Sequence, residues 1–269
     1  MRRTTCVFVL ALIISSSARA AEPVAVAKAR TLYNAADFDA AIDAATEARK
    51  QPAAADAAAL VLARAHLERY RQRADPNDLT AARDALRAVN QEALNARDRV
   101  DLLVGLGQSL FLGEAYGAAA ELFDTALIQS SALSRRARSL LLDWWASALD
   151  REAQSRPFER RAAVFARIVT RMEEELRVDP ACAPASYWLA VATRGAGDLD
   201  RAWDAAVAGW VRASLNPETA ASVRADLDRL VTQALISETA RQRQPSPREA
   251  QETIASLRSE WELIKSQWP

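Results

Sequence analysis

Residues 103–126, near the middle of the chain, carry apolar and small residues at the spacing of two packed helices. Apolar positions recur at steps of three and four residues, first over 103–110 and then, after a short break, over 116–126. These positions are Leu103, Leu106, Gly107, Leu110, Tyr116, Ala119, Phe123 and Ala126. Gly107 and Ala119 are small enough to let two antiparallel helices approach closely, while the larger residues fill the space around the contact. The pattern predicts a helical hairpin.

Related helix pairs are predicted on both sides of this hairpin. The five predicted pairs cover residues 22–55, 56–90, 100–133, 139–180 and 183–216. The pair at 139–180 departs most from the others, since its two helices are longer. Glycine is scarce, strand-type alternation is absent, and good helix formers dominate the chain, so an all-α fold is predicted.

Two further helices without the paired pattern are predicted at 217–243 and 246–268. Their starts are marked by Asn216-Pro217-Glu218 and by Ser246-Pro247-Arg248-Glu249, which combine capping residues with proline in the first turn. In the last helix, one face carries Ile254, Leu257, Trp261, Ile264 and Trp268. We interpret it as a cap over the open end of the array. The alternative is a docking helix for another protein.

The spacing over 103–126 resembles that of the tetratricopeptide repeat family. The resemblance implies a right-handed superhelix of about five helix pairs, with residues 21–269 forming one domain. Two departures from the family pattern are expected: a longer turn at Ala74-Asp75-Pro76-Asn77, and Ile168 and Glu175 at positions where the family has alanine. The resemblance also implies an inner face that is lined mainly by the first helix of each pair and holds a partner.

The family's groove positions, carried over pair by pair, predict the residues that contact this partner. They are Arg30, Tyr33, Arg64, Gln108, Phe111, Asp143, Ser147, Asp150, Tyr187 and Arg194. The set mixes aromatic rings, guanidinium groups and amide or carboxylate oxygens. Such a mixture suits an extended peptide, whose backbone and side chains both need partners.

The first twenty residues have the pattern of a secretory signal peptide. Arg2 and Arg3 precede an apolar run over 6–14, and the small-x-small triplet Ala18-Arg19-Ala20 follows, so we predict cleavage after Ala20. The twin-arginine export route is an alternative. The apolar run is shorter than the roughly 20 residues that a bilayer requires, so no stable membrane insertion is expected after cleavage. The mature protein is predicted to be periplasmic or secreted.

Removal of residues 1–20 would leave 32 basic and 35 acidic residues, a formal charge of −3. A near-neutral, slightly acidic chain gives no electrostatic reason to expect nucleic-acid binding. Cys182 would be the remaining cysteine, which excludes an intramolecular disulfide. We expect its thiol to be buried.

The sequence offers few groups for catalysis. His66 is the one histidine and is expected to be structural, and Cys182 has no histidine near it in the sequence. The run Glu173-Glu174-Glu175 is interpreted as a solvated acidic face, since adjacent helical residues point in different directions. Nucleophile-elbow, phosphate-loop and zinc-protease motifs are absent from the sequence. No enzymatic activity, cofactor or metal is therefore predicted.

The leading hypothesis is a noncatalytic periplasmic or secreted scaffold that binds another protein or an extended peptide in its groove. The alternative is a small-molecule-handling accessory component of a periplasmic transport system. It depends on whether Trp144, Trp145, Trp188 and Trp203 line an apolar pocket or form core, of which core is favoured. Self-association is a third hypothesis. The identity of the partner and the oligomeric state do not follow from the sequence.

Overall fold

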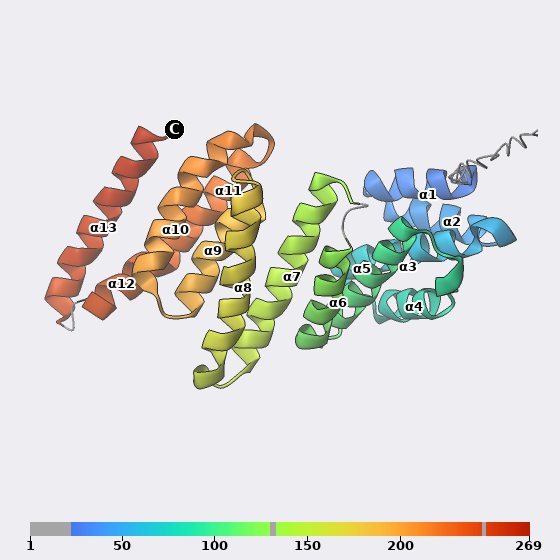
Figure 1. The fold of residues 1–269 in the computed structure, drawn as a ribbon, viewed down its shortest axis with the longest axis horizontal. Helices are drawn as coiled ribbons and strands as arrows, with labels where there is room; N and C mark the ends of the chain where they lie inside the picture. Colours follow the sequence, from blue (N-terminus) through green and yellow to red (C-terminus); the bar gives the residue numbers. More distant parts are fainter. Residues whose placement is uncertain (1–22, 130–132, 244–245) are drawn as a thin grey trace, which may run out of the picture.

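The computed structural model describes residues 23–129, 133–243 and 246–269, and within them the chain is helical and contains no strand (Figure 1). The all-α prediction is thereby confirmed. The predicted signal peptide at 1–20 lies outside the described residues. Among the described helices, none is both long and apolar enough to cross a membrane.

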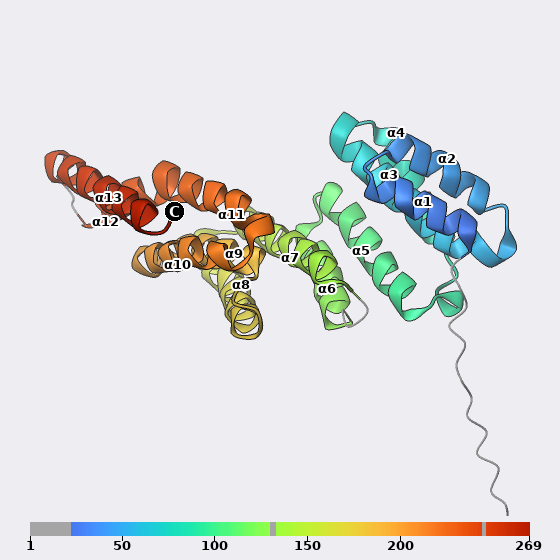
Figure 2. The same ribbon diagram turned by 90° about the horizontal axis from the view of Figure 1, so that it is seen from above.

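Ten helices form five consecutive pairs, each joined by a short turn, and the pairs follow one another along the length of the molecule (Figure 2). The first helices of the pairs are α1 (Val24–Asn34), α3 (Ala55–Arg73), α5 (Ala96–Leu112), α7 (Arg135–Ser155) and α9 (Ala183–Gly195). The second helices are α2 (Phe38–Ala48), α4 (Pro76–Arg87), α6 (Tyr116–Ile128), α8 (Phe158–Val178) and α10 (Leu199–Arg212). As expected, α7 and α8 are the longest pair, with 21 residues each.

The chain ends in two helices that lie beyond the last pair. The first combines α11 (Pro217–Leu230), a π-helical turn (Val231–Leu235) and α12 (Ile236–Arg243), and the second is α13 (Pro247–Gln267). Leu257 and Trp261 of α13 are buried against a cluster that includes α10, whereas Trp268 is 51% exposed. The central part of the apolar face predicted for this helix, at Leu257 and Trp261, thus covers this end of the molecule.

Three of the five pairs share one kind of turn. Two residues after the first helix, the backbone adopts the left-handed conformation, at Ala36 (φ 59°), Glu114 (φ 63°) and Gly197 (φ 86°). Asp37 and Asp198 follow two of these residues, and their carboxylates accept hydrogen bonds from backbone N–H groups in the first turn of the second helix. The same local geometry therefore reverses the chain in separate pairs.

Glycines allow close contacts between neighbouring helices, both within a pair and between two pairs. A Cβ atom on Gly107 would lie 2.5 Å from the ring of Phe123, and one on Gly195 would lie 2.5 Å from the ring of Phe165. Phe123 is fully buried, as is Ala119 beside it. The packing predicted for residues 103–126 is therefore present, with Gly107 making room for an aromatic ring.

The expected long turn at Ala74-Asp75-Pro76-Asn77 is not found. Helix α3 extends to Arg73, and α4 begins at Pro76, so only Ala74 and Asp75 lie between them. Asp75 accepts a hydrogen bond from the backbone N–H of Asn77, and proline suits the first position of a helix. Pro76 and Asn77, which were expected in the turn, belong to α4 instead.

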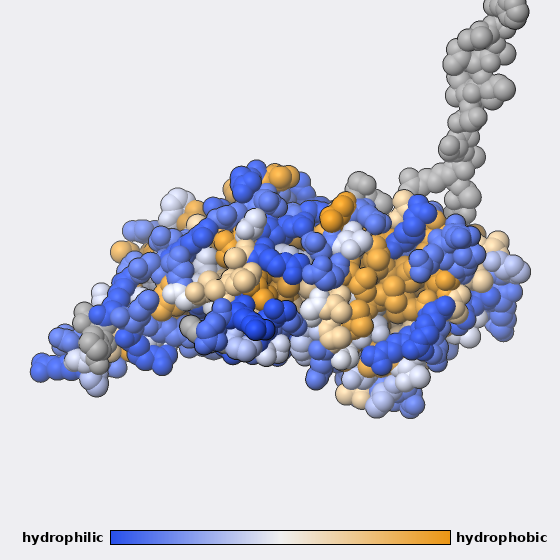
Figure 3. All heavy atoms as spheres, turned by 60° about the horizontal axis from the view of Figure 1, so that its bottom comes forward, coloured by the Kyte–Doolittle hydropathy of each residue, from blue (hydrophilic) through white to orange (hydrophobic). Residues whose placement is uncertain are grey.

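The odd-numbered helices form one row. Each of α1, α3, α5, α7 and α9 contacts the next odd-numbered helix. The backbones of α2, α4, α6 and α8 do not approach one another as closely within the described residues, although two ion pairs, Arg167–Glu121 and Arg171–Asp124, join α8 to α6. Helix α4 packs less extensively on α5 than α2 packs on α3, and Leu103, Leu106 and Leu110 of α5 are only partly buried. On the face shown in Figure 3, hydrophobic surface gathers over the N-terminal half of the chain.

Candidate binding groove

Two side chains reach across an intervening helix on the face of the odd-numbered row. Arg30 of α1 donates to the carboxylate of Asp101 on α5 (2.8 Å), and the guanidinium of Arg71 on α3 lies 5.1 Å from the ring centre of Trp144 on α7. These contacts link α1 to α5 and α3 to α7 on this side of the row. We call this surface the groove.

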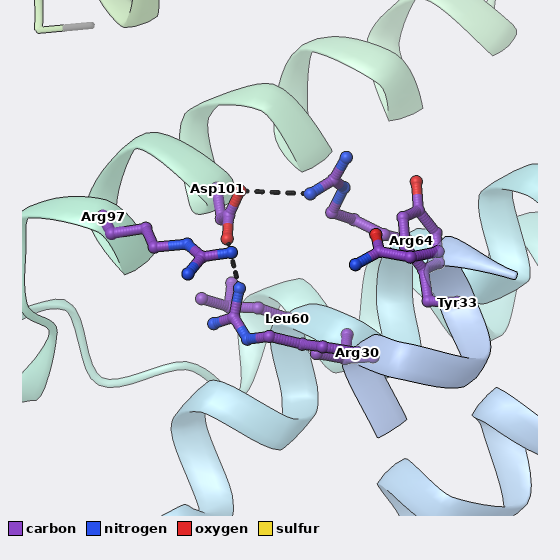
Figure 4. Close-up of a pocket in the computed structure, with 8 residues that line it drawn as sticks. Arg30, Tyr33, Leu60, Arg64, Arg97 and Asp101 are labelled. Carbon is purple, nitrogen blue, oxygen red and sulfur yellow. Dashed lines mark hydrogen bonds and ion pairs between the residues drawn. The ribbon is translucent and has the colours of Figure 1, made fainter. Parts of the chain in front are cut away.

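A pocket at the N-terminal end of the groove is lined by Arg30, Tyr33, Arg64, Arg97 and Asp101, and we call it the arginine pocket (Figure 4). Its cavity volume is about 40 Å3, enough for a small polar group. Arg64 donates to Asp101 (3.1 Å), and Figure 4 shows the guanidinium of Arg97 directed toward the same carboxylate. Three guanidinium groups from α1, α3 and α5 therefore converge on one acid.

Among the described residues, the arginine pocket holds one guanidinium group outside its ion pairs. Arg30 also donates to Asp98 (2.5 Å), so the described ion pairs of the pocket involve Arg30 and Arg64 but not Arg97. Arg97 forms no hydrogen bond or ion pair with any described residue. Because α5 begins at Ala96, the positive end of its helix dipole lies beside Arg97. The pocket is thus suited to a small anionic group.

Tyr33 supplies an aromatic wall to the pocket. The guanidinium of Arg64 lies 4.9 Å from the centre of its ring. Burial raises the pKa of the Tyr33 hydroxyl above its usual value, although the nearby Arg64 opposes this effect. The hydroxyl stays protonated near neutral pH. Tyr33 therefore offers a neutral hydrogen-bonding group next to the charged ones.

Further along the groove, α7 presents Asp143, Ser147 and Asp150 on one side over two turns, and we call these residues the α7 face. The indole N–H of Trp188 on α9 donates to Asp143 (2.8 Å). Surrounding protein raises the pKa of Asp143 and of Asp150 by displacing water from around their carboxylates. Neither carboxylate forms an ion pair within the described part of the chain.

Tyr187 of α9 lies next to this face. Its ring packs edge-on against Trp188, with ring centres 5.4 Å apart. Burial raises the pKa of the Tyr187 hydroxyl, and the carboxylates of Asp226, Asp150 and Asp143 add to the effect. The α7 face therefore has an acidic and aromatic character, in contrast to the arginine pocket.

The structure places the ten sequence-predicted groove residues in three groups. Arg30, Tyr33 and Arg64 meet in the arginine pocket, and Asp143, Ser147, Asp150 and Tyr187 lie on or beside the α7 face. The remaining residues are Gln108, Phe111 and Arg194. The Nε and Nη2 groups of Arg194 donate to the two carboxylate oxygens of Glu238, at 2.8 and 2.6 Å.

Gln108 and Phe111 do not lie open in the groove as expected. Gln108 is only 3% exposed, and its amide oxygen is buried without a hydrogen-bond partner. Phe111 is half-buried, with its ring packed against Tyr116 (5.2 Å) and Trp144 (5.0 Å). The ring of Trp144 on α7 covers part of Phe111.

Sequence reasoning missed Arg97 and Asp101. They stand four residues apart at the start of α5, which places both on one helical face. The third pair was expected to begin only near residue 100, so Arg97 was left outside it. A polar pair at this spacing, just before the best-matched hairpin, was the available signal.

The other residues considered for catalysis have structural contacts. His66 is hydrogen-bonded to Asp78 (2.7 Å), which also accepts from Arg69, so the three side chains join α3 to α4. Cys182 is buried as expected, and burial raises the pKa of its thiol. Within the described segments, no group of three or more histidine, cysteine, aspartate or glutamate residues is arranged to hold a metal ion.

The acidic run in α8 is less solvated than expected. Glu173 pairs with Arg201 of α10, and Glu175 pairs with Arg138 of α7. Glu174 alone of the three is classed as exposed. The run therefore connects α8 to its neighbours on both sides, because consecutive helical residues point toward different helices. Ile168, the other departure from the family pattern, is fully buried.

The tryptophans lie mainly in the core. Trp145, Trp188 and Trp203 are 2%, 7% and 8% exposed, which confirms the core interpretation for them. Trp144 is partly buried, with its ring centre 5.0 Å from that of Phe111. Trp145 also borders an open hollow of about 390 Å3, whose other walls come from Asp124 of α6 and from α8.

Comparisons with known proteins give no match. No family model, no curated protein and no solved structure matched the chain. The resemblance to the tetratricopeptide repeat family therefore stays a prediction from the sequence.

Proposed function

We propose that this protein is an exported, noncatalytic scaffold that binds an extended segment of another polypeptide along the groove. The proposal includes a tetratricopeptide-like, right-handed superhelical arrangement of the five helix pairs, with the odd-numbered helices on the inner side. Export follows from the signal-peptide pattern at residues 1–20.

One observation carries the proposal: polar groups from successive odd-numbered helices gather on a single surface of the row, where Arg30 reaches Asp101 across α3. The arginine pocket combines groups from α1, α3 and α5, and the α7 face continues this surface toward Tyr187. Donors, acceptors and aromatic rings are thus spread over several helices. An extended polypeptide, with backbone and side-chain groups at regular intervals, has the length and chemistry to meet them.

The noncatalytic part of the proposal rests on how the reactive side chains are used. His66 is engaged with Asp78 between α3 and α4, and Cys182 is a buried thiol with a raised pKa. Neither residue lines the arginine pocket. The groups that do line the groove are suited to binding and hold no nucleophile paired with a base.

Co-purification from the native host tests this function. The full-length protein would be tagged and isolated as the wild type, as Arg97→Glu and as Ser147→Arg. The first change reverses the charge of the pocket's unpaired cation, and the second fills the groove at α7. Both are expected to reduce recovery of a specific polypeptide by about tenfold, the effect of roughly 1.4 kcal/mol of binding energy. Arg177→Glu, an exposed arginine of α8, is the matched control.

Equal recovery of the same polypeptides by all four proteins would contradict the groove assignment. The competing function, handling of a small molecule, is favoured by the hollow beside Trp145. Native mass spectrometry of the purified protein separates the two functions. A retained organic ligand without a bound polypeptide would favour the small-molecule function.

A further inference from the structure

Among the described residues, the two ends of the groove differ in the sign of the charge that prevails there. Several of its charged side chains neutralise one another, and these internal pairs are Arg30–Asp101, Arg64–Asp101, Arg71–Glu68, Arg194–Glu238 and Arg229–Asp226. Outside these pairs, the described lining of the arginine pocket contributes Arg97. The α7 face contributes Asp143 and Asp150, and Arg151 follows them on α7 without an ion pair to a described residue. The first site is cationic, and the second has more acidic than basic groups.

At the arginine pocket, the donors available to a ligand belong to Arg97 and Arg64. Arg97 is exposed, and the side chain of Arg64 is 26% exposed although it touches Asp101. The Nε atom of Arg64 is buried and has no hydrogen-bond partner. A carboxylate entering from the groove would meet both guanidinium groups. Asp101 would weaken the binding of that carboxylate, because it already forms ion pairs with Arg30 and Arg64.

At the α7 face, neither carboxylate forms an ion pair with a described residue. Arg151 and Arg194 act on Asp150 through their charges alone. Asp150 also accepts a hydrogen bond from Gln154 (2.7 Å).

The Trp188 N–H that holds Asp143 is a neutral donor. Arg71 acts on Asp143 only through its charge and is itself bonded to Glu68 (2.6 Å). Burial raises the pKa of Asp143 by removing water from around its carboxylate, and the nearby charge of Asp226 adds to this effect. A lysine or arginine side chain from a ligand would supply a positive charge beside the ring of Tyr187.

The helix geometry sets the separation of these two sites. Phe111 packs against Trp144, so the C-terminal end of α5 lies level with the middle of α7. Arg97 lies about 20 Å from Phe111 along the α5 axis, at 1.5 Å per residue. Neighbouring helices are about 8–10 Å apart. The arginine pocket and the α7 face are therefore roughly 20 Å apart, which an extended chain spans in about six residues.

We infer that the bound polypeptide segment is a charge-matched strand: it places a carboxylate in the arginine pocket and, about six residues away, a lysine or arginine side chain against Asp143 and Asp150. This inference rests on the proposed function, because it specifies the segment that the groove would bind. It adds a requirement for charge spacing that groove binding alone does not impose.

Fluorescence anisotropy with synthetic peptides tests the charge spacing. Three labelled 12-residue peptides of Gly, Ser and Ala would each carry one Glu and one Lys, separated by one, six or ten residues. We expect the six-residue peptide to bind the full-length protein about fivefold more tightly than the other two, since exposed ion pairs contribute up to about 1 kcal/mol each. Added salt should weaken this preference.

A double variant locates the preference in the groove. Asp143→Asn with Asp150→Asn keeps the side-chain size and removes both charges, so the advantage of the six-residue peptide should disappear. Asp204→Asn, on an exposed residue of α10, is the matched control and should preserve it. Circular dichroism would establish that all variants are folded.

The inference is overturned if the three peptides give the same result, whether all bind alike or none binds. It is also overturned if the double variant keeps the preference. The proposed function fails separately, through the co-purification experiment: recovery of a polypeptide that depends on the groove, without any preference for charge spacing, would leave the scaffold intact and remove only the charge-matched strand.

Discussion

The arginine pocket and the α7 face belong to the same row of helices, yet they use charge differently. In the pocket, Asp101 has a side chain only 10% exposed and holds arginines from two other helices. On the α7 face, Asp143 is exposed and receives a single neutral hydrogen bond from Trp188. The same arrangement of helices thus supports one region that is tied together by ion pairs and another whose charges stay available.

The contrast implies that the two regions divide stability and recognition between them. In the pocket, charged side chains connect α1, α3 and α5 and therefore contribute to the fold as well as to binding. On the α7 face, apolar and aromatic packing beneath the surface supports the helices, and the carboxylates are left for a ligand. Changes in the two regions should accordingly have different consequences.

The largest difference in stability is expected between the replacement of Asp101 in the pocket and that of Asp143 on the α7 face. Asp101→Ala should lower the free energy of unfolding by about 2–3 kcal/mol, because it leaves nearly buried guanidinium groups of Arg30 and Arg64 without a shared partner. Asp143→Ala should cost no more than about 1 kcal/mol, the usual loss for one hydrogen bond. Urea denaturation measures both. Equal losses would remove the distinction between the regions.

The second prediction concerns the packing that the two regions share. Gly107→Ala and Gly195→Ala each force a methyl group to within 2.5 Å of a phenylalanine ring, one in the pair α5–α6 and the other against α8. Each should destabilise the protein by about 1–3 kcal/mol, the usual cost of overpacking. Similar losses in thermal denaturation would indicate a common framework. A neutral effect at either position would show that its pair packs loosely.

A smaller effect is expected at the turns. Gly197 has φ 86°, and an added Cβ would meet nothing within 4 Å. Gly197→Ala should still lower stability by about 1 kcal/mol because of backbone strain alone. Ala36→Gly, at φ 59° in the first pair, should be neutral or stabilising by a few tenths of a kcal/mol, since the same strain is relieved there. An unchanged melting temperature for Gly197→Ala would contradict this account.

The smallest effect concerns pH. Asp143 is expected to titrate above 3.8, because surrounding protein disfavours its charged form. Asp78 is expected to titrate below 3.8: burial alone would raise its pKa, but the hydrogen bonds from Arg69 and His66 lower it. NMR titration of the side-chain carboxyl groups measures both midpoints.

The two shifts have opposite consequences for stability. The stabilising contribution of Asp78 is present above its unfolded pKa and is lost as the pH falls through its lower folded pKa. For Asp143, the cost of holding a charged carboxylate is present above its raised folded pKa and disappears as the pH falls toward the unfolded value. Midpoints in the reverse order would contradict the assigned environments.

The sequence was sufficient for the helices but not for all of the groove. Spacing of apolar and small residues placed both helices of 103–126 and the long helices α7 and α8, because each buries a regular stripe. The turn at Ala74 was misjudged, since a left-handed alanine ends α3 without any glycine to mark it. A local sequence pattern does not reveal such a turn when the packing of the neighbouring helices compensates the backbone strain of the left-handed alanine.

The groove residues show a similar division. Arg30, Tyr33 and Arg64 were predicted and meet in one pocket, whereas Gln108 was predicted and is buried. Whether a position on α5 is open depends on how the neighbouring helices pack around it, which is a tertiary property. Arg97 was missed for a different reason, because the start of α5 falls before the recognisable hairpin.

Site-specific photo-crosslinking tests the central claim of a polypeptide-binding groove most directly. A photoreactive amino acid would replace Asn34, which lines the arginine pocket, or Ala166, which lies at the hollow between α6 and α8. Illumination in the native host, followed by mass spectrometry, would identify attached polypeptides. The account predicts crosslinks to a specific polypeptide from position 34 and none from position 166. Crosslinks from position 166 alone would contradict it.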